Sequence, residues 1–409
     1  MSEKKFDVLI IGAGPAGAAT AITLGRSGLS VGILEKARFP RDKICGDALS
    51  VDVVNQLKVL SPTLNAAFEK VAKTTSYGVS IYSPDRNHIN IPFLYEGKKR
   101  GGFICPRLNF DHVLIGQLKE SPTVKLFENC QVNQVTIKNE TVEVETSQGS
   151  FQAQIIVGAD GAHSVVSKKL MNTSIDKRHY SAGLRMYFEN VSSFHAENFI
   201  ELHFFQEILP GYLWIFPLPG NKANVGIGML SSEVSRKRVN LRETLETLLL
   251  THPDLKERFQ NAKALETAKG FGLPLGSKKR KLSGERFLLT GDAASLIDPF
   301  TGEGIANAIR SGRIAADHVI KSFEKKDFSE KFNRGYDKEI YHRMWGELRI
   351  SRTLQRLCRY SWLFNFVVKR ANQSKQINQF LADSLANIDK KKSLAHPGFY
   401  LRLFFKREK

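Results

Sequence analysis

Hydrophobic residues occur in short, regularly spaced runs through the N-terminal part of the chain. Apolar runs at 6–11 and 30–34 flank a segment of small residues over 15–27, and this order predicts a strand, a helix and a second strand. Shorter runs at 124–127, 132–138, 141–146 and 154–158 predict further strands around them. Because strands that alternate with helices form sheets covered by helices, we expect an α/β unit here.

The pattern changes between 181 and 230, where apolar residues alternate with small or polar ones, as is typical of antiparallel strands with one buried face. A strand then returns at 287–290, a long helix is predicted over 302–323, and the chain after about 325 is mainly helical. We therefore expect an α/β (α+β) fold with a discontinuous Rossmann-type domain, an inserted antiparallel sheet domain and a helical C-terminal region. The Rossmann-type domain is expected to span 1–170 and 271–325. The sheet domain is expected to span 171–270 with parts of 51–105, and the helical C-terminal region 326–409.

Composition narrows the class of protein. The 409 residues are 42% hydrophobic and 25% charged, which is ordinary for a soluble globular protein. The sequence has no apolar run of about eighteen residues and no secretory signal pattern, so we expect a cytoplasmic protein. Its four cysteines are far apart and lack metal-like spacing, so no metal site is expected.

A glycine-rich turn joins the first predicted strand to the first helix. Gly12 permits a tight turn, Gly14 lets the backbone approach a pyrophosphate, and Gly17 lets the helix pack closely against the strand. Pro15 and Ala16 open the helix, whose N-terminus offers free N–H groups and a partial positive charge to phosphates. The turn therefore predicts a phosphate-binding element.

An acidic residue follows this turn at a distance typical of dinucleotide-binding units. Glu35 lies 18 residues after Gly17, at the end of the second predicted strand, where a carboxylate can accept both ribose hydroxyls. Lys36, the next residue, is expected beside the same nucleotide. The combination of turn, helix and carboxylate predicts a dinucleotide site rather than a purely structural unit.

A later segment identifies the dinucleotide as FAD. Residues 288–305 end a predicted strand and begin a long helix, with Asp292 at the junction. An acidic residue there can hydrogen-bond a ribityl hydroxyl, a group that FAD has and NAD lacks. The helix N-terminus at Gly302, Gly304 and Ile305 would face the flavin and stabilise the negative charge formed on reduction. We expect FAD as a non-covalent cofactor.

These segments, with 158–161 between them, resemble the flavoprotein group typified by p-hydroxybenzoate hydroxylase. In that group the aspartate of the middle segment, Asp160 here, helps to organise contacts with both FAD and NAD(P)H. The arginine that usually follows is replaced by Ser167, with Lys168 beside it. Since the sequence has no second turn of the GxGxxG type, the resemblance implies NAD(P)H, or another reductant, as a transient electron donor.

Two stretches resemble the geranylgeranyl reductase family, and the likeness extends over roughly 1–325. The stretch 39–47 matches the family's K-x-C-G-D/E pattern, which lies against the flavin and here includes Cys45 and Gly46. The stretch 210–217 matches the Y-x-W-x-F-P pattern, which lines the lipid cavity in that family. Flavin halogenases share much of the scaffold but have W-x-W-x-I-P at this place.

The same resemblance implies two further FAD contacts. Arg107 fits the family's arginine on the cofactor side, and Val132 fits a backbone contact to the adenine. Arg41 and Lys43 could bind FAD phosphates, an anionic substrate head group or only solvent, and the residues themselves do not choose between these roles.

Four residues are candidates for the substrate side. Tyr212, Trp214 and Phe216 alternate and therefore share one face of a strand, where they could line an apolar cavity or form an ordinary sheet core. The resemblance favours substrate binding by all three. Cys45 could protonate or position the substrate, or be a small buried packing residue, and with Tyr212 and Trp214 it is a candidate catalytic residue.

Charge is distributed unevenly. Lys and Arg number 60 against 41 Asp and Glu, and 331–409 alone carries 18 basic and 6 acidic residues with thirteen aromatic ones. Basic charge mixed with aromatic rings, Trp362, Phe404 and Phe405 among them, suits an anionic membrane surface or a phosphate-bearing ligand, although a solvated helical tail has the same composition. One expectation is therefore a peripheral position at the inner face of a membrane. Nucleic acid is not expected as a partner, because the usual binding motifs are absent from the sequence.

Three functions fit an FAD-dependent oxidoreductase with these features. The first is a reductase that passes hydride from reduced FAD to a C=C bond of an isoprenoid or prenyl lipid, with electrons from NAD(P)H or another donor. The alternatives are an NAD(P)H-dependent monooxygenase (hydroxylase) and a flavin electron carrier to a quinone. Fold alone does not separate them, because function depends on the site.

Overall fold

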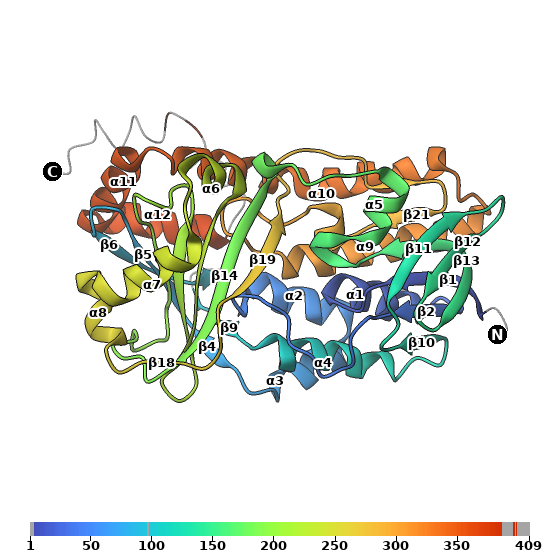
Figure 1. Ribbon diagram of the computed structural model, residues 1–409, viewed down its shortest axis with the longest axis horizontal. Coiled ribbons are helices and arrows are strands. Elements are labelled where there is room, and N and C mark those ends of the chain that lie inside the picture. Colours follow the sequence, from blue (N-terminus) through green and yellow to red (C-terminus); the bar gives the residue numbers. More distant parts are fainter. Residues whose placement is uncertain (1–3, 96–97, 387–395, 397, 399–409) are drawn as a thin grey trace.

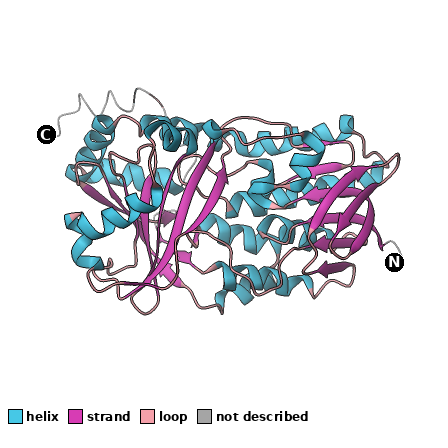
Figure 2. Cartoon of the chain, in the orientation of Figure 1, coloured by secondary structure: helices cyan, strands magenta, loops and turns pink. Residues whose placement is uncertain are grey.

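The computed structural model describes residues 4–95, 98–386, 396 and 398. Two eight-stranded sheets lie toward opposite ends of an elongated molecule, with helices around and between them (Figure 1). Strands and helices alternate through most of the chain, and the last described part is helical (Figure 2). The predicted α/β fold, with an inserted sheet and a helical C-terminal region, is confirmed.

The first sheet carries the glycine-rich turn. Its strands are β1 (Lys4–Ile11), β2 (Val31–Leu34), β10 (Val124–Phe127), β11 (Val132–Ile137), β12 (Val142–Thr146), β13 (Gly149–Gly158), β20 (Ser283–Gly284) and β21 (Phe287–Leu289). They are ordered β10-β2-β1-β13-β12-β11, and β21 pairs with β13 and with β20. The strands β10, β2, β1, β13 and β21 run parallel, so their carboxyl ends meet at one edge. Helices cover this sheet, and the last four residues of β1 are buried.

Besides α10, described below, six helices of the described chain pack around this sheet. They are α1 (Pro15–Leu24), α2 (Val51–Leu60), α3 (Pro62–Glu69), α4 (Arg107–Leu118), α5 (Val165–Met171) and α9 (Ile305–Lys325). α1 and α9 are in close contact, and Thr20 Oγ1 donates to the carbonyl of Gly312 at 3.0 Å. A Cβ on Gly312 would lie 2.3 Å from the Ala16 carbonyl oxygen, so only glycine allows this approach. The two helices that begin at the sheet's carboxyl edge are thereby held together.

Three predicted element bounds need correction. α1 ends at Leu24 rather than at 27, because the Ser27 hydroxyl donates to the Leu24 carbonyl at 2.7 Å and closes the turn. α9 begins at Ile305 rather than at 302, because Gly302 has a left-handed φ of +72° that a helix does not allow. β13 begins at Gly149 rather than at 154, because its first half pairs with β12.

The second sheet is built from two distant parts of the chain. Its strands are β5 (Gly78–Tyr82), β6 (His88–Pro92), β14 (Tyr180–Glu189), β15 (Ile200–His203), β16 (Tyr212–Leu218), β17 (Lys222–Leu230), β18 (Lys263–Ala264) and β19 (Lys269–Pro274). They are ordered β18-β14-β17-β16-β15-β5-β6, with β19 also on β14. Within 181–230 the strands pair in the predicted antiparallel manner, whereas β15 pairs in parallel with β5, which belongs to an earlier part of the chain. The domain bound expected at 271 falls inside β19.

One face of this sheet is covered by α6 (Ser231–Lys237), α7 (Leu241–Thr251) and α8 (Pro253–Phe259), and its other face looks toward the first sheet. Short strands and 3₁₀ turns complete the junction: β3 (Ala48–Leu49), β4 (Thr74–Ser76), β7 (Leu94–Tyr95), β8 (Lys98–Lys99), β9 (Gly102–Ile104), η1 (Gly161–His163), η2 (Lys177–His179) and η3 (Gly291–Ala294). The strands β3, β9 and β4 form a small sheet of their own.

The C-terminal helices connect the two halves. They are α10 (Glu330–Leu357), α11 (Ser361–Gln373) and α12 (Lys375–Ala386). α10 packs along α9 and β20, and Tyr336 Oη donates to the Leu289 carbonyl at 2.6 Å, whereas α11 and α12 pack on β6 (Figure 1). None of the described helices combines the length and the apolar sequence that crossing a bilayer requires.

Candidate active site

The glycine-rich turn has the geometry that its sequence predicts. Gly12 has a φ of +95°, which favours glycine, and its N–H donates to the Leu34 carbonyl at 2.8 Å. A Cβ on Gly17 would lie 1.9 Å from the Gly12 carbonyl oxygen, so α1 and the turn touch at this point. At Gly14, by contrast, no described atom beyond the two adjacent residues lies within 4 Å of a Cβ position, and the residue lines a cavity together with Pro15 and Ala16. Gly14 thus leaves space for a ligand beside the turn, while Gly17 allows α1 to pack closely against the turn.

Glu35 closes the same turn from the end of β2. Its Oε2 accepts from the Ala13 N–H at 2.9 Å, and its Oε1 accepts from the Ala37 N–H at 3.0 Å. Glu35 and Lys36 both line the cavity. Each carboxylate oxygen has a second lone pair, so the ribose contact predicted from the sequence is compatible with these bonds.

Arg107 is held at the cavity wall by an ion pair that the sequence analysis missed. It lies in the first turn of α4, and its Nε and Nη2 donate to the two oxygens of Asp111, each at 2.7 Å. Arg41 donates to the same carboxylate at 2.7 Å. Burial lowers the pKa of the Arg107 guanidinium, but Asp111 more than offsets this and keeps its pKa above the ordinary value. The i, i+4 spacing on a helix is the signal that could have revealed this pair.

The middle segment places an acidic side chain at the carboxyl end of β13. Asp160 Oδ2 accepts from the N–H groups of Val165 and Val166 at 2.7 and 3.2 Å, which caps α5. Burial raises the pKa of Asp160, and its Oδ1 is buried without a hydrogen-bond partner in the described part of the chain. Asp160 and Val132, the first residue of β11, both line the cavity.

The last cofactor segment faces this region from β21 and α9. Asp292 lies in η3, and Gly302, Gly304 and Ile305 lead into α9; all four residues line the cavity. A Cβ on Gly304 would lie 3.4 Å from Asp292 Oδ1, so the carboxylate sits directly at the N-terminus of α9. The positive end of the helix therefore faces the cavity next to an acidic acceptor.

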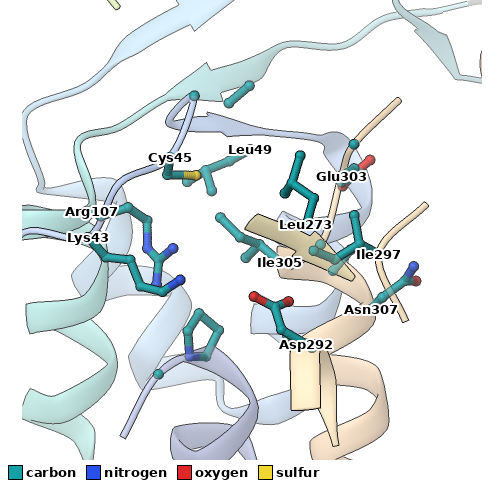
Figure 3. Close-up of a pocket in the computed structure, with 18 of the residues that line it drawn as sticks. Lys43, Cys45, Leu49, Arg107, Leu273, Asp292, Ile297, Glu303, Ile305 and Asn307 are labelled. Atoms are coloured by element: carbon teal, nitrogen blue, oxygen red, sulfur yellow. The ribbon is translucent and has the colours of Figure 1, made fainter. Parts of the chain in front are cut away.

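These segments enclose one cavity of about 1130 Å³. Figure 3 shows Lys43 and Arg107 on one side, Asp292 and Ile305 opposite them, and Cys45 close to Leu49 at the upper edge. Of the residues predicted to bind cofactor, Gly17 alone is not among the described residues that line it. The other residues predicted to bind cofactor therefore line one continuous cavity.

The substrate candidates line the same cavity from β16. Tyr212, Trp214 and Phe216 lie on one face of the strand. The ring centroid of Trp214 lies 6.3 Å from that of Tyr212 and 6.2 Å from that of Phe216. The Tyr212 hydroxyl donates to the Thr301 carbonyl, and Trp214 Nε1 donates to Asn224 Oδ1 at 2.9 Å. The wall continues onto residues that the sequence analysis did not single out, although they alternate along their strands: Ile200, Leu202, Phe271 and Leu273.

Cys45 borders both parts of the cavity. Burial raises the pKa of its thiol, the charge of Arg107 opposes this, and the charge of Asp47 adds to it, so that the pKa stays above the ordinary value. A thiol with a raised pKa keeps its proton at neutral pH. Cys45 is therefore a protonated group between the residues predicted to bind the cofactor and those predicted to bind the substrate.

A buried polar network behind Cys45 was also missed. Asn224 Nδ2 donates at 2.8 Å both to the Cys45 carbonyl and to Asp47 Oδ2. The Tyr187 hydroxyl donates to the same Asp47 oxygen at 2.6 Å, and the Arg185 guanidinium lies 4.0 Å from the Tyr187 ring centre. The network joins β14, β16 and β17 to the loop of Cys45, and the sequence offers no local signal for it.

The residues present fit FAD. The open backbone at Gly14 and the N-terminus of α1 suit a pyrophosphate, and the unpartnered Asp160 Oδ1 leaves an acceptor for a ligand. Asp292 at the N-terminus of α9 suits a ribityl hydroxyl beside a group that becomes anionic. When bound, FAD supplies hydride transfer.

Comparisons with known proteins agree with this geometry. The family described as FAD binding domain matches residues 5–321. A digeranylgeranylglycerophospholipid reductase from Methanocella arvoryzae is 29% identical over 352 residues, which cover 83% of each chain. A menaquinone reductase from Mycolicibacterium smegmatis is 29% identical over 324 residues, which cover 76% of each chain.

Solved structures show the same fold. A geranylgeranyl bacteriochlorophyll reductase-like protein from Thermoplasma acidophilum superimposes with a TM-score of 0.80, at 22% identity, over 96% of this chain and 99% of that one. A halogenase in complex with phloroglucinol and FAD gives 0.74 at 19% identity, over 98% and 90%. The chain therefore belongs to the family described as FAD binding domain.

Proposed function

We propose that this flavoenzyme reduces C=C bonds of an isoprenoid lipid, with NAD(P)H or another reductant as the transient donor of electrons. The observation that carries the proposal is that the aromatic wall formed by Tyr212, Trp214 and Phe216 contacts the loop of Cys45 and Gly46, which borders the predicted cofactor site. A Cβ on Gly46 would lie 3.0 Å from the Phe216 ring and 3.6 Å from Trp214 Nε1. An apolar chain against that wall would therefore lie next to Cys45.

Reduction of an isolated double bond places a hydride on one carbon and a proton on its neighbour. The chain must then exclude water, hold the lipid and provide the proton. Trp214 and Phe216 are buried and apolar and meet the first two needs, and Cys45 carries an acidic hydrogen at the junction. The relatives named digeranylgeranylglycerophospholipid reductase support a prenyl substrate.

We assign the residues accordingly. Substrate contacts are assigned to Tyr212, Trp214 and Phe216, and proton supply or positioning to Cys45, with Tyr212 and Trp214 beside it. FAD contacts are assigned to two stretches of chain, 1–170 and 271–325, through residues that shape or line the cavity: Gly12, Gly14, Pro15, Ala16, Gly17, Glu35, Lys36, Cys45, Gly46, Arg107, Val132, Asp160, Asp292, Gly302, Gly304 and Ile305.

The reaction is tested by anaerobic reoxidation. The FAD-loaded protein, reduced chemically and kept free of oxygen, is expected to be reoxidised by a lipid with geranylgeranyl chains dispersed in detergent. Mass spectrometry should then show lipid products heavier by pairs of hydrogen atoms. A saturated lipid with phytanyl chains is the matched control, since it offers the same apolar shape without a double bond.

Two other outcomes would contradict the proposal. If only oxygen reoxidises the flavin and a substrate gains an oxygen atom, the protein is a hydroxylase. If menaquinone accepts the electrons in its ring while its prenyl double bonds stay intact, the protein is an electron carrier to a quinone, an outcome that the menaquinone reductase relative makes worth including.

We also propose that the C-terminal part binds an anionic membrane surface, where a lipid substrate would be found. Tyr360 and Trp362 are 57% and 60% exposed at the junction of α10 and α11, and Arg356 and Arg359 are exposed beside them. Exposed aromatic rings and basic residues suit the head-group region. Phe404 and Phe405 lie outside the described residues.

Membrane binding is tested with vesicles. The protein is expected to cosediment with anionic vesicles at low salt and to be released at high salt, because exposed charges are screened. Trp362→Ala should weaken this binding, whereas Leu250→Ala, at a residue 67% exposed elsewhere on the surface, should not. Equal binding to neutral and anionic vesicles would contradict the proposal.

A further inference from the structure

A buried carboxyl lies two residues after Cys45. Asp47 is 0% exposed, has a φ of +65° and directly precedes β3 in the small sheet formed by β3, β9 and β4. Its carbonyl accepts from the Cys105 N–H at 2.9 Å. Asp47 and Cys45 both line the active-site cavity. Two groups that can carry a proton therefore share one short, rigid loop.

The two oxygens of Asp47 differ in their surroundings. Oδ2 accepts from Tyr187 Oη at 2.6 Å and from Asn224 Nδ2 at 2.8 Å, while Oδ1 is buried with no hydrogen-bond partner among the described residues. An unpaired oxygen on a buried carboxylate is costly, because the charge loses its hydration without gaining a hydrogen bond, whereas a proton on that oxygen removes the charge. The unpaired oxygen thus favours the carboxylic acid.

The charges around Asp47 do not supply a full counter-ion. Arg185 on β14 lies over the Tyr187 ring and interacts with Asp47 by charge, but Arg185 also pairs with Asp42, at 2.7 Å, and with Glu266. Within the described part of the chain, Asp47 also interacts by charge with Cys45 and Asp42 on its own loop and with Cys105 after β9, while Asn224 on β17 is neutral. Burial raises the pKa of Asp47 to about 6, against the lowering effect of Tyr187, Asn224 and Arg185. The carboxyl can therefore gain and lose a proton near neutrality.

We propose that Asp47 is the proton reservoir behind Cys45, and this inference rests on the proposed function. As the new C–H bond forms on the substrate carbon next to the one that takes the hydride, the S–H bond of Cys45 breaks. The resulting thiolate takes the proton of the Asp47 carboxyl, so the O–H bond breaks and the S–H bond forms again. Asp47 regains its proton from solvent, and one proton is consumed for each double bond. The second transfer is downhill, because a carboxyl is a stronger acid than a thiol.

The first test measures the coupling without any turnover. In the FAD-loaded protein, the rate of Cys45 alkylation by iodoacetamide is followed from pH 6 to 10 by mass spectrometry of the modified peptide. A carboxylate beside the sulfur raises the pKa of the Cys45 thiol, so Asp47→Asn is expected to lower this pKa. Alkylation at pH 8 should then be faster, about tenfold for each unit by which the thiol pKa falls. Asparagine tolerates a left-handed φ, which makes this variant compatible with the loop. An unchanged alkylation profile would overturn the inference.

The second test uses single-turnover reoxidation by the geranylgeranyl lipid at different pH values. Protonated Asp47 is the active form, so the wild-type rate should fall as the pH rises through the pKa of Asp47, and Asp47→Asn should be slower and lack this step. Tyr187→Phe removes a hydrogen bond that favours the carboxylate, which raises the pKa of Asp47 and should move the step to higher pH. Asp47→Glu should restore part of the rate and of the pH dependence.

The two tests separate failure of the inference from failure of the proposed function. If Asp47→Asn keeps the wild-type pH step, or if Tyr187→Phe does not move it, Asp47 is not the reservoir. If the lipid fails to reoxidise the wild-type protein, the proposed function is wrong and the reservoir role falls with it, although the alkylation profile still shows whether Asp47 controls the Cys45 thiol.

Discussion

Replacing Gly17 by alanine is expected to abolish FAD binding and to lower the stability of the protein strongly. The new Cβ would lie 1.9 Å from the Gly12 carbonyl oxygen, a backbone atom that cannot move aside as a flexible side chain could. Relief requires α1 to move away from the turn, and overpacking of this kind costs roughly 1–3 kcal/mol or more. The measurements are the flavin absorbance of the purified protein and its thermal unfolding with and without added FAD.

Two alanine variants serve as controls for this prediction. At Gly14 no described atom beyond the two adjacent residues lies within 4 Å of the Cβ position, so Gly14→Ala should leave the stability of the FAD-free protein unchanged and weaken only FAD binding, because the methyl group occupies the cavity. Gly116→Ala, at an exposed position in α4 with similar free space, should stabilise the protein by up to about 1 kcal/mol and leave FAD binding intact. A yellow, stable Gly17→Ala protein would show that α1 can shift and still hold the cofactor.

Replacing Trp214 by alanine is expected to slow lipid-dependent reoxidation at least about tenfold, a loss of about 1.4 kcal/mol or more in transition-state stabilisation. The variant removes the centre of the aromatic wall and leaves Asn224 Oδ1 without its donor, so it also weakens the tie between β16 and the Asp47 network. FAD should remain bound, since we assign Trp214 to the substrate and not to the cofactor. The measurement is single-turnover reoxidation together with the FAD content.

A matched control distinguishes the loss of a residue that lines the cavity from the loss of a large side chain elsewhere in the protein. Trp345 packs against the hydrophobic core around the first sheet and is not among the described residues that line the cavity. Trp345→Ala should therefore lower stability and leave the reoxidation rate of the folded enzyme close to that of the wild type. Trp214→Phe keeps an aromatic ring and removes the N–H, and we expect it to fall between wild type and Trp214→Ala. Equal rates for Trp214→Ala and wild type would remove this residue from the substrate site.

The parts of the fold that sequence could predict are those set by local sterics and spacing. Gly12 and Gly17 occupy positions where the backbone conformation or a close approach requires glycine, and Glu35 follows at the length of one helix and one strand. The alternation in β16 likewise fixes one face for Tyr212, Trp214 and Phe216. Each of these features depends on neighbours along the chain, and each lies where the sequence predicts.

The remaining features depend on partners that are far apart in sequence. Asp47 meets Tyr187 140 residues later and Asn224 177 residues later, and neither spacing carries a periodic signal. The parallel pairing of β5 with β15 escaped prediction for the same reason, because alternation along a strand does not reveal the direction of its neighbour. The sequence therefore predicted the cavity wall better than the polar network behind it.

The position of β21 beside β13 has a consequence for synthesis on the ribosome. β13 ends at Gly158 and β21 begins at Phe287, so roughly 130 residues must be added before the parallel sheet can be completed. At about 5–20 residues per second this delay is about 6–26 s, and α9, which closes the cofactor side, emerges later still. The nascent chain must therefore keep an open sheet edge shielded until most of the protein exists. FAD can stabilise only a nearly finished polypeptide, and a shortage of flavin should lower the yield of folded enzyme rather than its rate of translation.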